Sequence, residues 1–248
     1  MTPTPPSGRD DRQGLPETIA IDGPAGAGKS TIGRLLAQEL GYLFLDTGVM
    51  YRAVALEALR QGISATNEPS LAEVAETLPI HVRVPSDTEN DGRLSTVLVE
   101  DEDITWEIRR PEVEAVVSEI ASHPTVRHAL VKQQRRLAKR GPVVMVGRDI
   151  TTEVLPDADL KIYLDASLEE RARRRYEELL ERGRKVTYKQ VEAEIAHRDD
   201  LDMHRAAGAL RQADDALRVF TDGHTVGQTL AKILDLVRGP SVKRGSET

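Results

Sequence analysis

Residues 23–30 constrain the fold of this chain more than any other stretch. They read Gly-Pro-Ala-Gly-Ala-Gly-Lys-Ser, which fits the phosphate-binding loop pattern of a glycine, four residues and then Gly-Lys-Ser or Gly-Lys-Thr. A strand-like run at residues 18–21 precedes the loop, and a helical pattern follows it at residues 31–40. Glycines let backbone N–H groups point into such a loop, and the helix N-terminus adds partial positive charge behind a bound anion. The sequence therefore predicts a strand–loop–helix unit that binds a nucleoside triphosphate.

Two side chains of this loop have separate predicted roles. We expect Lys29 to reach the outer phosphates as a point charge, and we expect the Ser30 hydroxyl to bind a magnesium ion. The residues predicted to contact the triphosphate are Gly23, Pro24, Ala25, Gly26, Ala27, Gly28, Lys29, Ser30 and Thr31.

Composition restricts the class of protein. The chain has 248 residues of which 39% are hydrophobic, enough for one sizeable core. Its formal net charge of −7 argues against a general binder of nucleic acids or anionic membranes. The absence of cysteine excludes disulfides, cysteine nucleophiles and thiolate metal sites. No apolar run approaches the roughly 20 residues that span a bilayer, and the N-terminus lacks a signal-peptide core. We expect a cytoplasmic, monomeric enzyme that acts on small molecules.

Apolar runs alternate with helical patterns along most of the chain. The strand-like runs are residues 18–21, 42–46, 143–146, 160–164 and 217–220. This alternation predicts an α/β fold with a doubly wound parallel sheet, and the near-continuous apolar runs are typical of central strands covered on both faces.

Three further segments break this pattern. Residues 64–105 contain two strand-like runs around a turn, which indicates a small inserted lobe, and residues 167–205 form a charged helical pair. The proline-rich residues 1–16 and the last residues, 240–248, have too few apolar side chains to fold, so we expect disordered tails. A single domain over residues 17–239 remains.

Polar residues follow the strands at the edge where ligands bind in such sheets. Arg52 lies shortly after the second strand, and Arg148 follows the strand at residues 143–146. The helix that ends near residue 205 adds a third group. At about 100° per residue, Arg198, Asp202 and Arg205 all lie within roughly 40° of the direction of Val191, which with Ile195 forms the apolar stripe of that helix. This placement favours an anionic, hydroxyl-bearing ligand, and a solvated helix face is the alternative.

The preceding helix carries a basic stripe. Arg171, Arg175 and Arg182 line one face, with Arg174 beside them and glutamates interspersed. Spacing alone slightly favours a surface helix with intrahelical ion pairs. In a kinase, arginines on a movable lid would instead neutralise charge on the transferring phosphoryl group.

Taken together, the motifs resemble those of the bacterial-type cytidylate kinases, a family of the nucleoside monophosphate kinase group. The resemblance covers residues 18–238. The motifs that carry it are residues 21–30, 45–52, 107–109, 147–149, 163–166 and 198–200.

This resemblance implies an ATP- and Mg²⁺-dependent phosphorylation of CMP and dCMP to CDP and dCDP. It implies a P-loop kinase fold with a monophosphate-binding lobe at residues 64–105 and a helical lid at residues 168–200. The implied catalytic residues are Lys29, Arg148, Arg171 and Arg175. The implied substrate contacts are Thr47, Tyr51, Arg52 and Arg148 for the monophosphate, Ser118, Arg127 and Asp149 for cytosine, Arg198 and Asp202 for the sugar, and Arg205 beside the phosphate or base.

Two positions depart from the family pattern. Val146 stands where the family usually has an acidic residue linked to magnesium or nucleotide, and Thr151 replaces a common glycine. An apolar side chain cannot organise metal-bound water, so we expect either weaker activity or a compensating carboxylate, with Asp22 and Asp46 as the candidates.

Two other functions stay open at this point. The segment around residues 28–42 is also similar to shikimate- and gluconate-type kinases, although Thr47-Gly48 and Tyr51-Arg52 favour a nucleotide acceptor. Val146 also leaves open a nucleotide-binding regulatory protein without turnover. The preference between CMP and dCMP is not predicted.

Overall fold

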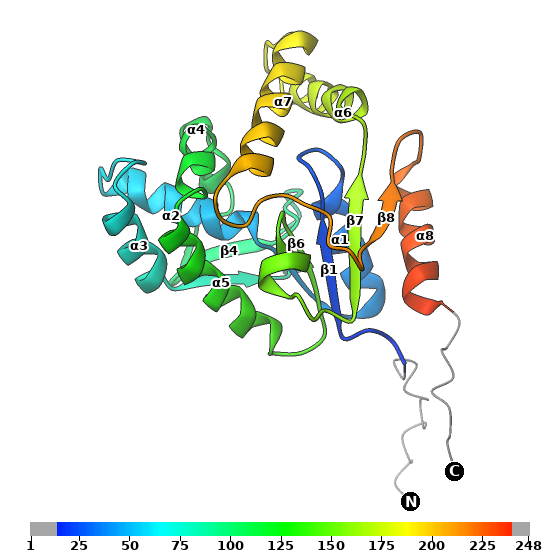
Figure 1. Ribbon diagram of the computed structural model, residues 1–248. Coiled ribbons are helices and arrows are strands. Elements are labelled where there is room, and N and C mark those ends of the chain that lie inside the picture. The colour runs from blue at the N-terminus through cyan, green and yellow to red at the C-terminus, as the bar shows by residue number, and fades with distance from the viewer. Residues whose placement is uncertain (1–13, 240–248) are drawn as a thin grey trace, which may run out of the picture.

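The computed structural model describes residues 14–239, which form a mixed α/β structure (Figure 1). Of the two predicted tails, residues 1–13 and 240–248 lie outside the described residues. Within residues 14–239, no helix is long and apolar enough to cross a membrane.

The central sheet has five strands, all parallel, in the order β2-β6-β1-β7-β8. They are β1 (Thr18–Asp22), β2 (Leu43–Asp46), β6 (Val143–Val146), β7 (Leu160–Asp165) and β8 (Leu217–Phe220). Strand β1 is central, with β6 and β2 on one side and β7 and β8 on the other, which confirms the predicted doubly wound sheet. All four residues of β6 are buried, as its continuous apolar run predicts.

Alternation along the strands divides the core into two layers. Val143 and Met145 belong to one hydrophobic cluster, whereas Val144 and Val146 belong to the other. The helices α1 (Lys29–Leu40) and α8 (Val226–Arg238) pack on the second layer. The first layer is covered by α2 (Gly48–Arg60), α3 (Glu68–Thr77), α4 (Pro111–Ile120) and α5 (Pro124–Ala138).

The inserted segment contains an antiparallel sheet of three strands. These are β3 (Ile80–Arg83), β4 (Thr96–Val99) and β5 (Glu102–Asp103), and the last of them lacks any apolar signal in the sequence. A short 3₁₀ helix, η1 (Glu107–Arg109), then leads into α4. In Figure 1 this sheet lies on the α2 side of the molecule, below the helical pair.

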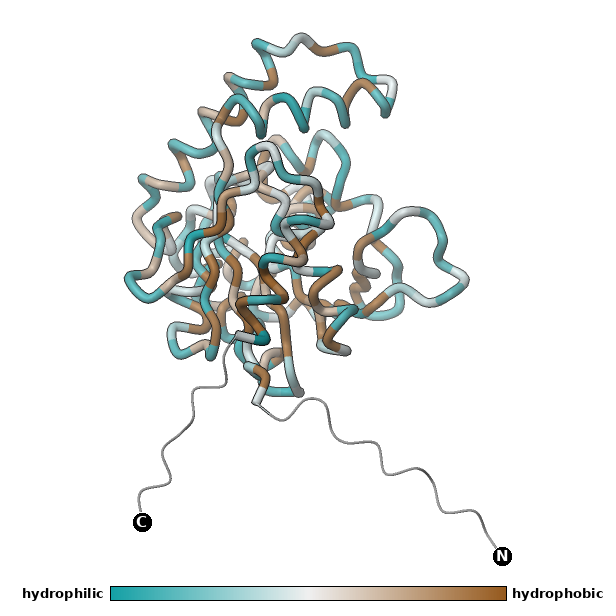
Figure 2. Tube along the Cα trace, turned by 90° about the vertical axis from the view of Figure 1, so that its right-hand side faces the viewer, coloured by the Kyte–Doolittle hydropathy of each residue, from teal (hydrophilic) through white to brown (hydrophobic). Residues whose placement is uncertain are grey.

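Two helices rise above the carboxyl end of the central sheet (Figure 1). They are α6 (Leu168–Glu181) and α7 (Tyr188–His204), joined through a small core that includes Ala172, Val191 and Ile195. Ser167 caps α6, and Thr187 forms a capping box at the start of α7. Figure 2 shows this pair as mostly hydrophilic, in contrast to the hydrophobic strands below it.

A π-helical turn, η2 (Ile150–Val154), follows β6 and was not expected from the sequence. The buried Asp22 at the end of β1 holds its start: it accepts hydrogen bonds from the backbone N–H groups of Ile150 (2.8 Å) and Thr151 (2.7 Å) and from the Thr151 hydroxyl (2.6 Å). Thr151, the residue that departs from the family glycine, therefore supplies two of these bonds, and its hydroxyl bond is one that glycine could not form.

Candidate active site

The phosphate-binding loop connects β1 to α1 at the carboxyl end of the sheet. Gly26 and Gly28 have φ values of +79° and +92°, in the left-handed region that side chains rarely adopt. At Gly26, an added Cβ would also lie 3.1 Å from the Cβ of Arg171, so the loop and the helical pair are closely packed here. The glycines predicted from the motif are thus required by the backbone.

Lys29 closes this loop from within. Its Nζ donates to the carbonyl oxygens of Gly23 (2.6 Å) and Pro24 (2.7 Å), and the side chain is buried. Burial lowers the pKa of Lys29 well below its usual range, the charge of Arg148 lowers it further, and Asp46 opposes both. An incoming phosphate would supply the negative charge that this lysine lacks.

Ser30 lies beside a carboxylate. Its hydroxyl donates to Oδ2 of Asp46 at 2.5 Å, and Oδ1 of Asp46 accepts the backbone N–H of Gly48 at 3.0 Å. A hydroxyl and a carboxylate are the hard oxygen ligands that magnesium prefers, and magnesium is commonly held by one or two protein oxygens plus substrate phosphates. Among the described residues, no group of three or more His, Cys, Asp or Glu side chains could hold a metal. The donor set therefore fits Mg²⁺ bound together with a phosphate.

Val146 faces the hydrophobic layer under α1. It is 1% exposed, and an added Cβ at Gly33 would lie 2.5 Å from its Cγ1. Its register partner on the neighbouring strand is Asp46, whereas Asp22 is committed to the turn η2. Of the two carboxylates considered for compensation, only Asp46 contacts the predicted magnesium ligand.

A first pair of arginines shares one carboxylate. Glu114 on α4 accepts from Arg52 on α2 (2.7 Å) and from Arg198 on α7 (2.8 Å). Burial opposes ionisation of Glu114, but the hydrogen bond and charge of Arg52, with Arg198 and Arg175, lower its pKa to about 2. The arginines predicted for the phosphate and the sugar are therefore brought together by a residue that the sequence did not single out.

A second group follows β6. Nε of Arg148 donates to Oδ2 of Asp202 at 2.7 Å, and Oδ1 of Asp202 lies 3.4 Å from the guanidinium of Arg205. The helix-face argument that placed Arg198, Asp202 and Arg205 on the inward side of α7 agrees with these contacts.

This second group continues into a buried ion pair. Arg205 lies 3.8 Å from Asp149, and Asp149 forms a very short contact with Arg127, whose guanidinium stands 5.3 Å from the ring centroid of Tyr51. A pocket of about 220 Å³ opens beside Arg127 and Asp149, and Gly208 lines it. A Cβ at Gly208 would clash with both side chains, so the loop after α7 packs directly on the pair.

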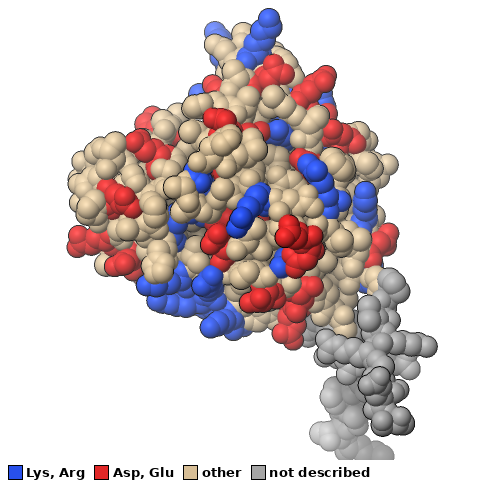
Figure 3. Space-filling view, in the orientation of Figure 1, with Lys and Arg blue, Asp and Glu red and all other residues tan. Residues whose placement is uncertain are grey.

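We call these eight residues the charge network: Arg52, Glu114, Arg127, Arg148, Asp149, Arg198, Asp202 and Arg205. On the surface seen in the orientation of Figure 1, acidic and basic side chains are intermixed, apart from a group of basic residues at the lower left (Figure 3).

The two predicted lid arginines lie in different surroundings. Arg171 is buried and donates to the carbonyl oxygen of Ala25 in the loop (3.1 Å) and to Asp199 on α7 (2.6 Å). Arg175 is half-exposed and pairs with Glu178 of its own helix at 2.8 Å. This pair is the kind that the surface-helix alternative predicts. Only Arg171 joins the lid to the phosphate-binding loop.

Three predicted substrate contacts are not members of the charge network: Tyr51, whose ring lies beside Arg127, and Thr47 and Ser118. The Thr47 hydroxyl is buried and donates to the carbonyl oxygen of Val146 at 3.1 Å. Ser118 is half-buried on α4 and has no hydrogen bond or ion pair to the network within residues 14–239.

Sequence reasoning missed Glu114 and Asp199. Asp199 follows Val191 and Ile195 at four-residue spacing, a signal that could have identified it, although it lies about 80° from Val191. Glu114 lies next to the buried Val113 on α4, as many surface glutamates lie next to buried residues. No sequence signal therefore distinguished Glu114 from an ordinary surface residue.

Comparison with known proteins gives a consistent family. Residues 19–239 match the family model described as cytidylate kinase. The chain is 53% identical over 221 residues to a cytidylate kinase of Chloroflexus aggregans, which covers 89% of this chain and 94% of the relative. It is 44% identical over 224 residues to that of Bacillus subtilis, covering 90% and 97%. A solved shikimate kinase from Acinetobacter baumannii in complex with shikimate shares 20% identity, with a TM-score of 0.47 and coverage of 94% and 98%.

Proposed function

This chain belongs to the cytidylate kinase family, and we propose that its phosphate-binding loop and its charge network hold the two nucleotides of the family reaction. The enzyme is a nucleoside monophosphate kinase that transfers a phosphoryl group from ATP to CMP or dCMP and forms CDP or dCDP. Family membership argues against the shikimate- and gluconate-type kinases, and the turnover assay below distinguishes the enzyme from a nucleotide-binding regulatory protein. The supporting observation is that the neighbouring parallel strands β1 and β6 carry the phosphate-binding loop with Lys29 and the paired Arg148 at the same, carboxyl, end of the sheet.

The donor half is the loop. We assign the triphosphate to the backbone N–H groups of residues 23–31 and to Lys29, which would exchange its two carbonyl acceptors for phosphate oxygens. Ser30 and Asp46 would hold Mg²⁺, which when bound neutralises charge on the phosphates. Asp46 thus takes the place of the acidic residue that Val146 replaces.

The acceptor half begins with Arg52 and Arg148. Each guanidinium is already paired with a carboxylate, Glu114 or Asp202, and would transfer its hydrogen bonds to the monophosphate. An oxygen of that phosphate attacks the terminal phosphorus of ATP as the bond to the bridging oxygen breaks. The attacking oxygen is already anionic, so no general base is needed, and positioning and charge neutralisation supply the catalysis.

The base and sugar lie farther along the charge network. We assign cytosine to Arg127 and Asp149 with Ser118, and the sugar to Arg198 and Asp202. The ring of Tyr51 lies against the Arg127 guanidinium and supports it. Burial and the charge of Asp149 raise the pKa of the Tyr51 hydroxyl to about 12, so that Tyr51 stays protonated and neutral. Thr47 and Arg205 would complete the phosphate end.

The lid supplies the remaining positive charge. Arg171 keeps the lid against the loop through Ala25 and Asp199, so it would stay in place during turnover. Within residues 14–239, Arg175 pairs with Glu178 of its own helix and with no other carboxylate, and it is the arginine we assign to the transferring phosphoryl group. Closure would exclude water, which otherwise accepts that group.

A coupled ADP-release assay with CMP, dCMP, UMP and AMP tests this proposal. We expect turnover with CMP and dCMP, and we expect Lys29→Met to lower kcat by at least a hundredfold. Absence of turnover with every acceptor would overturn the proposal. The monomeric state and the cytoplasmic location remain predictions.

A further inference from the structure

The only tryptophan of the chain, Trp106, links the inserted lobe to an arginine. Its indole N–H donates to Oδ2 of Asp91 at 2.8 Å, and the guanidinium of Arg109 lies 5.7 Å from its ring centroid. The side chain is 45% exposed, so burial alone does not account for its orientation. Two specific contacts hold it, one at the indole N–H and one over the face of the ring.

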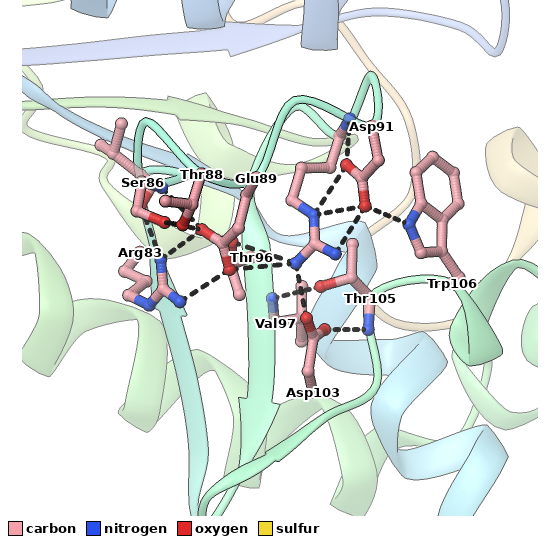
Figure 4. A network of polar contacts seen from close by, with 12 residues as sticks. Arg83, Ser86, Thr88, Glu89, Asp91, Thr96, Val97, Asp103, Thr105 and Trp106 are labelled. Carbon is pink, nitrogen blue, oxygen red and sulfur yellow. Dashed lines mark hydrogen bonds and ion pairs between the residues drawn. The ribbon is translucent and has the colours of Figure 1, made fainter.

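Asp91 is itself fixed by the loop between β3 and β4 (Figure 4). Arg93, with a side chain only 8% exposed, donates to Asp91 (2.6 Å) and to Asp103 (2.5 Å) and lies 3.2 Å from Glu89. The hydrogen bonds of Arg93 and Trp106 hold the pKa of the Asp91 carboxyl well below its usual range. Asp91 therefore stays ionised and presents a fixed acceptor to the indole.

On its other side, Trp106 leads directly into η1 and the charge network. Ile108 is fully buried in the core, and its carbonyl oxygen accepts a hydrogen bond from Arg52 at 3.4 Å. Arg109 is the next residue. Desolvation lowers its pKa, and the charges of Asp46 and Arg52 act on it with opposite signs. Because the Ile108 carbonyl contacts Arg52, Arg109 follows directly in η1 from the residue that supports the arginine assigned to the acceptor phosphate.

We propose that Trp106 is a positioning residue for the acceptor phosphate. Pinned by Asp91, its ring holds the Arg109 guanidinium beside the phosphate end and steadies the η1 turn whose Ile108 carbonyl supports Arg52. Asp91 of the inserted lobe thereby fixes the positions of Arg109 and Arg52 through Trp106 and η1. This inference rests on the proposed function, because it assigns CMP to the side of the charge network that contains Arg52.

The kinetic test compares Trp106→Ala, Trp106→Phe and Asp91→Asn with wild type. Trp106→Ala removes both contacts, and we expect KM for CMP to rise about fivefold or more while KM for ATP and kcat change less than twofold. Trp106→Phe keeps a ring beneath Arg109 but loses the hydrogen bond to Asp91, and Asp91→Asn keeps the ring but weakens that bond, so each should show part of this rise in KM for CMP. The matched control is Asp87→Asn, an exposed carboxylate of the same loop that forms no ion pair within residues 14–239.

A double-mutant cycle separates positioning from general stability. If Trp106 acts through Arg109, then Trp106→Ala should add little to KM for CMP in an Arg109→Ala background. Unchanged KM for CMP in Trp106→Ala, or full additivity with Arg109→Ala, would overturn the inference. Thermal melts of each variant identify one that fails to fold, and Trp106→Phe then carries the test.

Fluorescence and calorimetry keep the inference separate from the proposed function. Emission from the single tryptophan should change when CMP binds the wild type, and this change should disappear in Arg109→Ala. Calorimetric titration with CMP measures the same affinity loss in Trp106→Ala without turnover. Wild type that binds CMP with this signature but does not turn over would refute the proposed function alone. CMP binding without any emission change would refute the role of Trp106.

Discussion

The two carboxylates at the strand ends should respond differently to the same substitution. Asp46→Asn removes a charge beside Ser30, whereas Asp22→Asn removes an acceptor that serves three donors in the turn η2. Both changes are isosteric, and both residues are the last residues of parallel strands, at the carboxyl end of the sheet. The pair therefore separates a role in magnesium binding from a role in folding.

The expected magnitudes follow from these contacts. Loss of a carboxylate that holds a metal ligand costs about 10- to 100-fold in metal affinity, equivalent to about 1.4–2.7 kcal/mol. Asp46→Asn should raise the Mg²⁺ concentration for half-maximal activity by that factor. Asp22→Asn turns an amide N–H₂ toward backbone donors and should cost about 1–3 kcal/mol of stability, because a buried donor loses its partner. For a chain of this size that corresponds to a melting temperature lower by about 2–12 °C.

The assay is a Mg²⁺ titration of turnover at saturating ATP and CMP, paired with thermal melts of the same preparations. An Asp46→Asn variant with an unchanged Mg²⁺ requirement would refute the assignment of Asp46 to the metal. A raised Mg²⁺ requirement in Asp22→Asn, without loss of stability, would show that the wrong carboxylate was chosen.

Three further outcomes are expected. The folded-state pKa of Glu114, about 2, lies below its ordinary value of 4.5. The ionised Glu114 carboxylate therefore stabilises the folded protein above pH 4.5, and this contribution is lost as the pH falls through about 2. Since Glu114 is partly exposed, Glu114→Gln should cost only about 1 kcal/mol in urea unfolding at pH 7 and nothing near pH 2. Gly33→Ala should cost about 1–3 kcal/mol because its Cβ would press on Val146, and a second change of Val146→Ala should restore the melting temperature. Asp149→Asn should raise KM for CMP at least tenfold, with KM for ATP unchanged in initial-rate kinetics, because it leaves Arg127 without its charged partner.

The parallel sheet could be predicted because its signals are local. Val143–Val146 is a continuous apolar run, and residues 23–30 form a motif whose glycines the backbone requires. The inward side of α7 was also predictable from angular spacing, since Asp202 is buried where the stripe places it.

The missing parts depend on contacts between distant segments. Glu114 joins Arg52 to Arg198 across 62 and 84 residues of sequence, and no periodicity within α4 indicates such partners. The strand β5 has only two residues, both acidic, so it forms through pairing with β4 rather than through propensity. The turn η2 likewise depends on Asp22, 128 residues away from Ile150.

The pairing of site arginines with carboxylates has a consequence for how nucleotides arrive. Arg52, Arg127 and Arg148 each face a carboxylate partner, in a chain of net charge −7, so little positive potential extends into solution. Electrostatic steering raises association rates only where such a potential exists, and it fades as ionic strength rises. Nucleotide association with this enzyme should therefore be slow for a charged ligand and nearly independent of salt. Recognition would then take place after encounter, when each phosphate displaces a carboxylate from an arginine already in position.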